Sequence, residues 1–330
     1  MLKVLHYGSK GSDLTLIEEI NRDYGLDFTR LDDSLSLANA GAAEGFPAVW
    51  ISTSSKVDRN VAGALIRAGV KYIVSQAAGT DHLDIESIRE SGLLAANVPD
   101  YSPSAISEYS ILLALSLLRK LKPTIRRVDA DNYTLPGLRG RELNTLAAGV
   151  VGAGRIGSET IRLLRGFGCG VHYHSRTEKP ELSALAEYHA APGTLYAACD
   201  ILFFHCPLTR ETRGMVNRET IAGMKDGVIL INTARGAIFD FSAVRDAMDE
   251  GKVDALGFDV YENEFEILRK IPIGTKPGDP VFCDLVSRDN VIYAPHASFF
   301  TDKSVRAMAA GAVANLHAYL TSGRCANELT

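Results

Sequence analysis

The sequence offers little to suggest a membrane, nucleic-acid or disulfide-bonded protein. Its longest apolar region, residues 105–118, contains Glu108 and is shorter than the roughly 20 residues that cross a bilayer. It has no basic run, and the net charge of −5 favours no polyanionic partner. The first residues lack the apolar core of a signal peptide. We therefore expect a cytoplasmic protein that binds neither nucleic acid nor membrane.

Cysteine is also scarce, and its spacing has no pattern. The odd number of five argues against a closed disulfide framework, and no pair has the spacing of metal ligands. We expect reduced thiols and no metal site. The five are Cys169, Cys199, Cys206, Cys283 and Cys325.

Short apolar runs alternate with helical patterns along the 330 residues, and this alternation starts again after residue 146. Such alternation predicts parallel sheets covered on both faces, so we expect two doubly wound α/β domains. An apolar helix within residues 98–121, capped by Ser102 with Pro103 in its first turn, links them. The other expected helices are 13–25, 60–70, 83–92, 155–168, 182–190, 217–224, 240–251 and 302–323. The expected strands are 3–8, 47–52, 71–76, 93–98, 146–152, 170–175, 201–206, 227–234, 255–260 and 290–298.

The stretch "GAGRIG" has the spacing of a dinucleotide-binding turn. Gly152 permits a sharp turn from strand to helix, Gly154 lets the backbone approach a pyrophosphate, and Gly157 allows the helix to pack closely. The helix N-terminus then offers free N–H groups to phosphates. A glycine turn alone is also compatible with a tight structural connection, but the predicted strand before it and helix after it favour dinucleotide binding.

Three polar residues follow predicted strands and therefore fall at the carboxyl edge of the sheet, where ligands bind. Arg235, Glu264 and His296 suit reduction of a 2-oxo acid. Arginine grips a carboxylate with two parallel hydrogen bonds, histidine donates a proton to the developing alkoxide, and a carboxylate beside the histidine favours its protonated form. Each residue taken singly has an ordinary structural explanation; the three together favour catalysis.

These motifs together resemble the D-isomer-specific 2-hydroxyacid dehydrogenases over essentially the full length, and most of all the D-lactate dehydrogenase branch. The resemblance implies Arg235 as substrate anchor, Glu264 as histidine partner and His296 as acid/base. The stretches that carry it are "AAGTDHLD" (77–84), "VPDYSPSAISEY" (98–109), "VVGAGRIG" (150–157), "CPLTRETRGMVN" (206–217), "MKDGVILINTARGAIFD" (224–240), "GFDVYENE" (257–264), "APHASFFTDKSVRAM" (294–308) and "CANEL" (325–329).

Further site residues are implied by the same resemblance. Ala78 and Gly79, with Tyr101, close over the substrate, and Phe300 lies near it; Tyr101 could instead be a hinge aromatic that only packs. Pro207 could simply end a strand. The implied cofactor residues are Arg155 and Ile156 at the pyrophosphate, Cys206 and Pro207 at the adenosine, and Thr212, Thr233, Ala234 and Asp259 toward the nicotinamide, with Arg235 and His296 beside it.

Two departures from the family pattern bear on the substrate. Gln76 stands where members often carry arginine, and Phe300 where an aromatic hydroxyl is frequent. Both remove polarity near the substrate and admit a larger apolar 2-oxo acid than pyruvate. The alternative within the enzymes is a dehydrogenase for a bulkier substrate: phenylpyruvate, 2-oxoisocaproate or 2-oxoglutarate. A dinucleotide-sensing regulator on the same scaffold is the alternative from another class.

A third departure concerns the cofactor. About 20 residues beyond the glycine turn an acidic residue normally holds the ribose hydroxyls. Here the strand end reads Ser175, Arg176 and Thr177, which removes repulsion of a 2′-phosphate and adds a cation and hydroxyl groups. We expect NADP(H) to be preferred and NAD(H) to remain usable. The alternative is that Arg176 points into water and Ser175 tolerates both cofactors.

Together these observations predict two doubly wound parallel-sheet domains. A flavodoxin-like substrate domain covers residues 1–100 and is completed by 300–330, and a Rossmann cofactor domain covers 101–299. A homodimer is expected from the resemblance alone.

Overall fold

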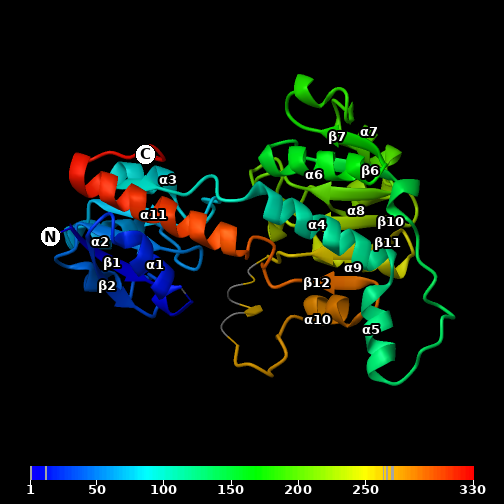
Figure 1. Ribbon diagram of the computed structural model, residues 1–330, viewed down its shortest axis with the longest axis horizontal. Helices are drawn as coiled ribbons and strands as arrows, with labels where there is room; N and C mark the ends of the chain where they lie inside the picture. The colour runs from blue at the N-terminus through cyan, green and yellow to red at the C-terminus, as the bar shows by residue number, and fades with distance from the viewer. Residues whose placement is uncertain (1, 12, 263, 265–266, 269–270) are drawn as a thin grey trace. The chain divides into compact units, whose positions relative to one another are not determined.

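The computed structural model describes residues 2–11, 13–262, 264, 267–268 and 271–330. The chain forms two compact units (Figure 1). The first unit comprises Met1–Ser102 and Phe300–Thr330, and the second comprises Pro103–Phe299. Each contains one parallel β-sheet with helices on both faces, as the alternation of strands and helices predicts. No helix in the described ranges is long and apolar enough to span a bilayer.

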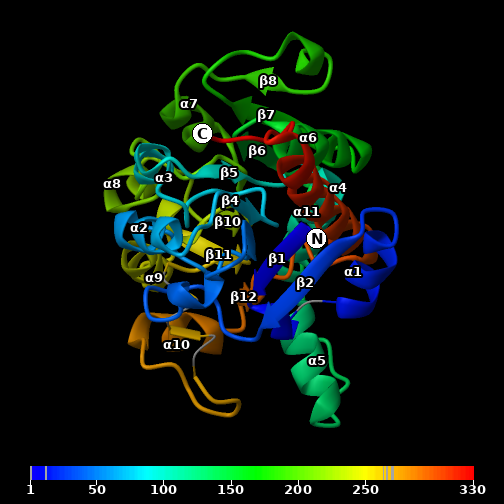
Figure 2. The same ribbon diagram turned by 90° about the vertical axis from the view of Figure 1, so that its left-hand side faces the viewer.

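The first unit has the strand order β2-β1-β3-β4-β5, which is the flavodoxin-like order. Helices α2 and α3 cover one face of this sheet, and α1 and α11 cover the other (Figure 2). Its strands are β1 (Leu2–Tyr7), β2 (Leu26–Leu31), β3 (Ala48–Ile51), β4 (Tyr72–Ser75) and β5 (Leu94–Ala96). Its helices are α1 (Leu14–Asn21), α2 (Arg59–Arg67), α3 (Ile85–Ser91) and α11 (Asp302–Ser322).

Local sequence sets the helix ends of this unit. Asp58 accepts the N–H groups of two first-turn residues of α2 at 2.9 Å, and Asp84 caps α3 at 3.0 Å. Thr301 caps α11 by accepting the N–H of Ser304, and Gly323, with a φ of +76°, is the C-terminal cap of α11. Such caps fix where each helix starts relative to the sheet it covers.

The second unit has the strand order β12-β11-β10-β9-β6-β7-β8, in which the order reverses between β6 and β9. This is the Rossmann arrangement with one added strand, β12. Helices α4 and α6 lie side by side on one face (Figure 1). The strands are β6 (Ala147–Val151), β7 (Gly170–His174), β8 (Glu187–Tyr188), β9 (Ile201–Phe204), β10 (Val228–Asn232), β11 (Val253–Phe258) and β12 (Val291–Tyr293). The helices are α4 (Pro103–Leu118), α5 (Leu121–Asp129), α6 (Arg155–Gly166), α7 (Pro192–Ala198), α8 (Arg218–Ala222), α9 (Phe241–Asp249) and α10 (Pro280–Ser287).

One predicted helix is wrong, and several elements were not predicted. Residues 182–190 form no α-helix. Leu182 ends a short 3-10 helix (Pro180–Leu182), and β8 then pairs with β7, with Glu187 opposite His172 and Tyr188 opposite Tyr173. The helix starts only at α7, whose first residue, Pro192, suits a first turn. Strand β2 was missed because only Leu26 is buried, so the apolar alternation is weak. Helices α5, α7 and α10 were also not predicted.

Candidate active site

Most predicted site residues of the second unit follow the carboxyl ends of its strands. Gly152 follows β6, Ser175 follows β7, Cys206 follows β9, Thr233 follows β10 and Asp259 follows β11. In a doubly wound sheet, ligands bind at this edge and at the point where the strand order reverses. The topology therefore gathers these residues at the β6/β9 switch point and beside it.

The glycine turn has the backbone geometry that its spacing predicts. Gly152 has a φ of +94°, and a Cβ there would crowd the backbone of Cys206. A Cβ at Gly157 would overlap the carbonyl oxygen of Gly152, so α6 packs on the turn only with glycine. Gly154 has open space around it and is the N-cap of α6, with no capping hydrogen bond from a side chain in the described ranges. The start of α6 at Arg155 and Ile156 is therefore where the resemblance expects the pyrophosphate.

The segment after β7 forms a tight polar turn. The Ser175 hydroxyl donates to the carbonyl oxygen of Thr177 at 2.6 Å, and the Tyr188 hydroxyl donates to the carbonyl oxygen of Ser175 at 3.3 Å. A hydrogen bond from Thr209 holds the pKa of Glu211 below its usual range, and the positive charge of Arg176 contributes to this. Glu211 is therefore an acidic neighbour of Arg176 that the sequence pattern did not single out.

The loop after β9 is organised by Thr212. Its hydroxyl donates to the carbonyl oxygen of Pro207 at 2.7 Å and accepts the N–H of Thr209 at 2.8 Å. The buried Cys206 thiol contacts the Met215 sulfur at 3.8 Å. Thr212 thus shapes the loop that follows the switch point.

His205 was missed by the sequence analysis and links three elements. Its Nε2 lies 2.9 Å from the Thr160 hydroxyl of α6, and its Nδ1 lies 3.5 Å from the Thr233 hydroxyl that follows β10. Thr160 donates its own hydrogen to the carbonyl oxygen of Ile156, so Nε2 of His205 is the donor in their bond. Burial lowers the pKa of His205 to about 3, which keeps the ring neutral.

The turn that carries Arg235 is held by the buried Asn232. The Asn232 amide accepts the N–H of Ala234 at 3.0 Å and donates to the carbonyl oxygen of Arg235 at 3.0 Å. Gly236 packs against the backbone of Tyr261, where a Cβ would overlap the main chain. The turn after β10 therefore lies directly against the segment after β11 that leads to Glu264.

His296 and Glu264 form a short hydrogen bond between Nδ1 and Oε1. The other carboxylate oxygen of Glu264 accepts the N–H of Tyr261 at 3.0 Å, which fixes the carboxylate. Because Glu264 accepts from Nδ1, this nitrogen carries a proton and Nε2 is left to exchange one with a ligand. The exposed fractions of the two side chains are 28% and 18%, so the pair is accessible but largely shielded.

Asp259 holds the backbone around His296 by hydrogen bonds. Its main-chain carbonyl oxygen accepts the N–H of His296 at 2.8 Å, and its carboxylate accepts the N–H groups of Ala297 and Ser298. Burial raises the pKa of Asp259, while the hydrogen bond from Ser298 and the charge of His296 oppose the rise. Asp259 therefore shapes the turn that presents His296.

The substrate residues suggested by resemblance belong to the first unit. The carbonyl oxygen of Ala78, next to Gly79, accepts the Asn97 amide at 2.7 Å, and Asn97 is itself held by Asn315 of α11 at 2.8 Å. The Gln76 side chain accepts the indole N–H of Trp50 at 3.0 Å. Tyr101 is half-buried, whereas Phe300 is exposed. The Asn97 and Asn315 supports were not predicted.

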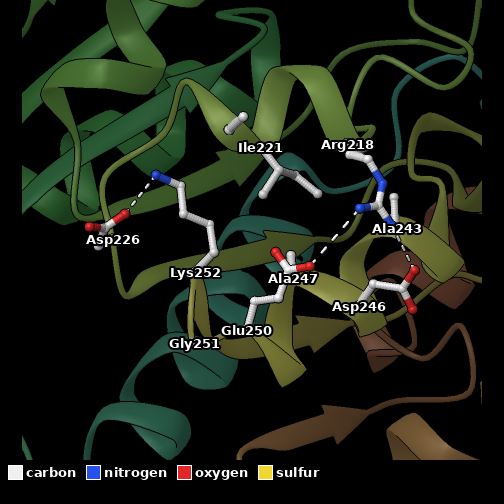
Figure 3. A pocket seen from close by; sticks show the side chains of 10 residues that line it. Arg218, Ile221, Asp226, Ala243, Asp246, Ala247, Glu250, Gly251 and Lys252 are labelled. Atoms are coloured by element: carbon white, nitrogen blue, oxygen red, sulfur yellow. Dashed lines mark hydrogen bonds and ion pairs between the residues drawn. The ribbon is translucent and has the colours of Figure 1, made fainter.

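A separate surface hollow of about 490 Å³ lies between α8 and α9 and the amino ends of β10 and β11, away from the carboxyl edge (Figure 3). Arg218 pairs with Asp246 at 2.9 Å, and Lys252 pairs with Asp226 at 2.7 Å. Both cations are therefore neutralised within the hollow itself, and its lining residues include no member of the His296 site.

A seven-stranded Rossmann sheet with a glycine turn at its switch point and a histidine–carboxylate pair at its carboxyl edge is the arrangement expected of a nicotinamide-dependent dehydrogenase. Residues 111–298 match the family described as D-isomer specific 2-hydroxyacid dehydrogenase, NAD binding domain. The chain belongs to this family.

Individual relatives agree over nearly the whole chain. An aromatic 2-oxoacid reductase of Clostridium sporogenes is 33% identical over 328 residues, 99% of either chain. A D-lactate dehydrogenase of Escherichia coli strain K12 is 32% identical over 331 residues, which make up 99% of this chain and 100% of that protein. The structure of a D-lactate dehydrogenase of Aquifex aeolicus, complexed with NAD and lactic acid, superposes with a TM-score of 0.88 at 29% identity, over 99% of this chain and 100% of that one.

Proposed function

We propose that this protein reduces a 2-oxo acid to the D-2-hydroxy acid with a nicotinamide cofactor, in the manner of a D-lactate dehydrogenase. The observation that carries the proposal is the His296–Glu264 pair beside the turn that presents Arg235. Family membership supports the reaction class and the D configuration.

Each residue of the candidate active site has a separate role in the proposed reaction. Arg235 binds the substrate carboxylate through its guanidinium, and Nε2 of His296 delivers a proton to the carbonyl oxygen as it becomes an alkoxide. Glu264 orients the imidazole and stabilises its charged form. A bound nicotinamide cofactor supplies the hydride. Asn232 and Asp259 act as positioning residues, because they hold the two turns that carry Arg235 and His296.

Within this activity we assign the cofactor preference to NADPH. The turn Ser175–Thr177 presents hydroxyl groups and the exposed Arg176 where an aspartate would repel a 2′-phosphate. NADH should remain usable, because no negative charge at Ser175 is needed to hold the ribose hydroxyls.

The substrate has two candidates. Pyruvate is supported by the similarity to D-lactate dehydrogenases. A bulkier apolar 2-oxo acid is supported by the bond between Gln76 and Trp50, which places a neutral amide where the family often has arginine. The similarity to an aromatic 2-oxoacid reductase also supports a bulkier substrate.

We assign cofactor binding to the second unit. The first unit contributes Ala78, Gly79, Tyr101 and Phe300 to substrate binding, and the second unit contributes Arg235 and His296.

We also infer a homodimer, in which α5 is the contact helix. None of the residues of α5 is buried, and its apolar side chains share one face. Exposed apolar residues on and near this helix are Leu112, Leu121, Ile125, Val128, Tyr133 and Leu135.

The test is steady-state turnover of the purified chain with pyruvate, phenylpyruvate, 2-oxoisocaproate and 2-oxoglutarate, each with NADPH and NADH. We expect reduction of at least one acid to the D product, identified by chiral chromatography. Cofactor binding without turnover of any member would instead favour a dinucleotide-sensing regulator.

A further inference from the structure

Two histidines and a glutamate converge at the edge of the Rossmann sheet, outside the site described above. His172 lies on β7, Glu187 lies opposite it on β8, and His189 follows β8. The Nδ1 atom of His172 lies 3.2 Å from Nε2 of His189 and 3.4 Å from Oε2 of Glu187. The ligand atoms of all three lie within 4.8 Å of one another.

These separations match the edges of a metal coordination tetrahedron. Zinc–nitrogen and zinc–oxygen bonds of about 2.0–2.1 Å set the ligand–ligand edges of a tetrahedron at about 3.3–3.4 Å. The two shortest separations in the cluster therefore need almost no adjustment to admit an ion. Two imidazoles and one carboxylate also form a ligand set that zinc commonly uses, with water in the fourth position.

A hydroxyl group outside the cluster orients His189 for this role. The Thr194 hydroxyl donates to the carbonyl oxygen of Ala191 at 2.8 Å, so it can only accept from Nδ1 of His189, 3.0 Å away. This bond places the His189 proton on Nδ1 and leaves the lone pair of Nε2 directed at His172 and Glu187. Metal-ligating histidines are held in this manner by a partner on the other ring nitrogen.

The side chain of His174 helps to hold the cluster in place, and solvent can reach it. Nδ1 of His174 lies 2.8 Å from the carbonyl oxygen of His189, which ties the end of β7 to the segment after β8. The side chain of Glu187 is 69% exposed and that of His172 is 21% exposed, so an ion enters from the Glu187 side. Burial lowers the pKa of His172 despite the opposing charge of Glu187, and the neutral ring is the ligating form.

We propose that His172, Glu187 and His189 form a binding site for a divalent transition-metal ion of the zinc class. The ion would link β8 to β7 through these side chains, next to the Ser175–Thr177 turn that follows β7. The proposal concerns metal binding and the stability of this sheet edge, and it does not depend on the proposed reaction.

The experiment uses the full chain, freed of metal by chelator and titrated with ZnCl2 in a calorimeter. We expect one Zn²⁺ per chain, a rise in the thermal unfolding temperature, and the visible absorption of a tetrahedral complex when Co²⁺ replaces Zn²⁺. His189→Ala should abolish the Co²⁺ spectrum. His317→Ala, which removes a histidine from α11 in the other unit, is the matched control and should leave it unchanged.

Two milder variants keep the test decisive if His189→Ala folds poorly. Glu187→Gln changes an exposed side chain and should weaken Zn²⁺ binding clearly. Thr194→Val keeps all three ligands but loses their orientation, and should weaken binding on the order of 10–100-fold. Absence of Zn²⁺ binding by the parent, or binding of equal strength by the parent and all these variants, would overturn the proposal.

Discussion

His296 has a φ of +54°, in the left-handed region that few residues other than glycine adopt. Holding a side chain there costs on the order of 1–3 kcal/mol, so surrounding contacts must impose it. Asp259 supplies these contacts through its carbonyl oxygen and its carboxylate. Such strain is common where a side chain must be aimed at a ligand, which agrees with the role proposed for His296.

Replacing this histidine tests that role directly. His296→Ala should lower kcat by on the order of 10²–10⁴-fold, the usual contribution of general acid–base catalysis. Glu264→Gln should have a smaller effect, because the imidazole remains. His317→Ala is the control. A His296→Ala enzyme that folds, binds cofactor and turns over like the parent would remove His296 from the mechanism.

Ser175 tests the cofactor preference. The parent should use NADPH at least about tenfold more efficiently than NADH, which corresponds to one charge-assisted hydrogen bond of about 1.5–3 kcal/mol. Ser175→Asp adds a negative charge that repels the 2′-phosphate, so the ratio of kcat/KM values should shift toward NADH. Ser183→Asp adds the same charge at an exposed position of another turn and should not shift it. A parent that prefers NADH contradicts the assignment.

The turn between β6 and α6 depends on contact of backbone with backbone. Gly157→Ala places a methyl group against the carbonyl oxygen of Gly152, so α6 must move away from β6. We expect a loss of about 2 kcal/mol or more in the free energy of unfolding, together with weaker cofactor binding. Gly166→Ala lies in the same helix with open space around it and should be neutral or slightly stabilising. Equal denaturation midpoints for the two variants would show that the close contact is unimportant.

The link from β9 to α6 through His205 predicts a pH dependence of stability. The pKa of His205 falls from 6.5 to about 3 on folding, so the unfolded chain binds the proton more tightly. Its contribution to stability is complete above pH 6.5 and is lost as pH falls from 6.5 toward 3; it amounts to a few kcal/mol. His205→Gln keeps a donor for Thr160 without titrating. Denaturant unfolding at several pH values should therefore show a flatter profile for this variant.

For the molecule as a whole, the apolar face of α5 predicts self-association. Light scattering should give the parent twice the mass of one chain, and the double variant Ile125→Asp/Val128→Asp should give the monomer, because two charges would be buried in the contact. Ile66→Asp, at a 39% exposed apolar position of α2, is the matched control. A parent that is monomeric at micromolar concentration would rule out this interface.

Features that depend on local pattern could be predicted before the structure was known. The doubly wound fold follows from strands alternating with helices, and the glycine turn from its spacing between a strand and a helix. Arg235, Glu264 and His296 were predicted as site residues because each follows a predicted strand and parallel strands end at the same edge of a sheet, and their roles stay predictions. Strand β2 and the strand at Glu187–Tyr188 escaped prediction, because edge strands bury few side chains and show weak alternation.

Features that depend on which segments meet in space required the tertiary structure. Residues 182–190 have a helical pattern, yet pairing with β7 makes two of them a strand and brings Glu187 and His189 to His172. Asp259 and His205 carry no local signal of their positioning contacts, since each acts on residues of another turn or element. Periodicity shows which face of a segment is apolar. The contacts named here form only once the strands are paired in the sheet, so periodicity does not reveal them.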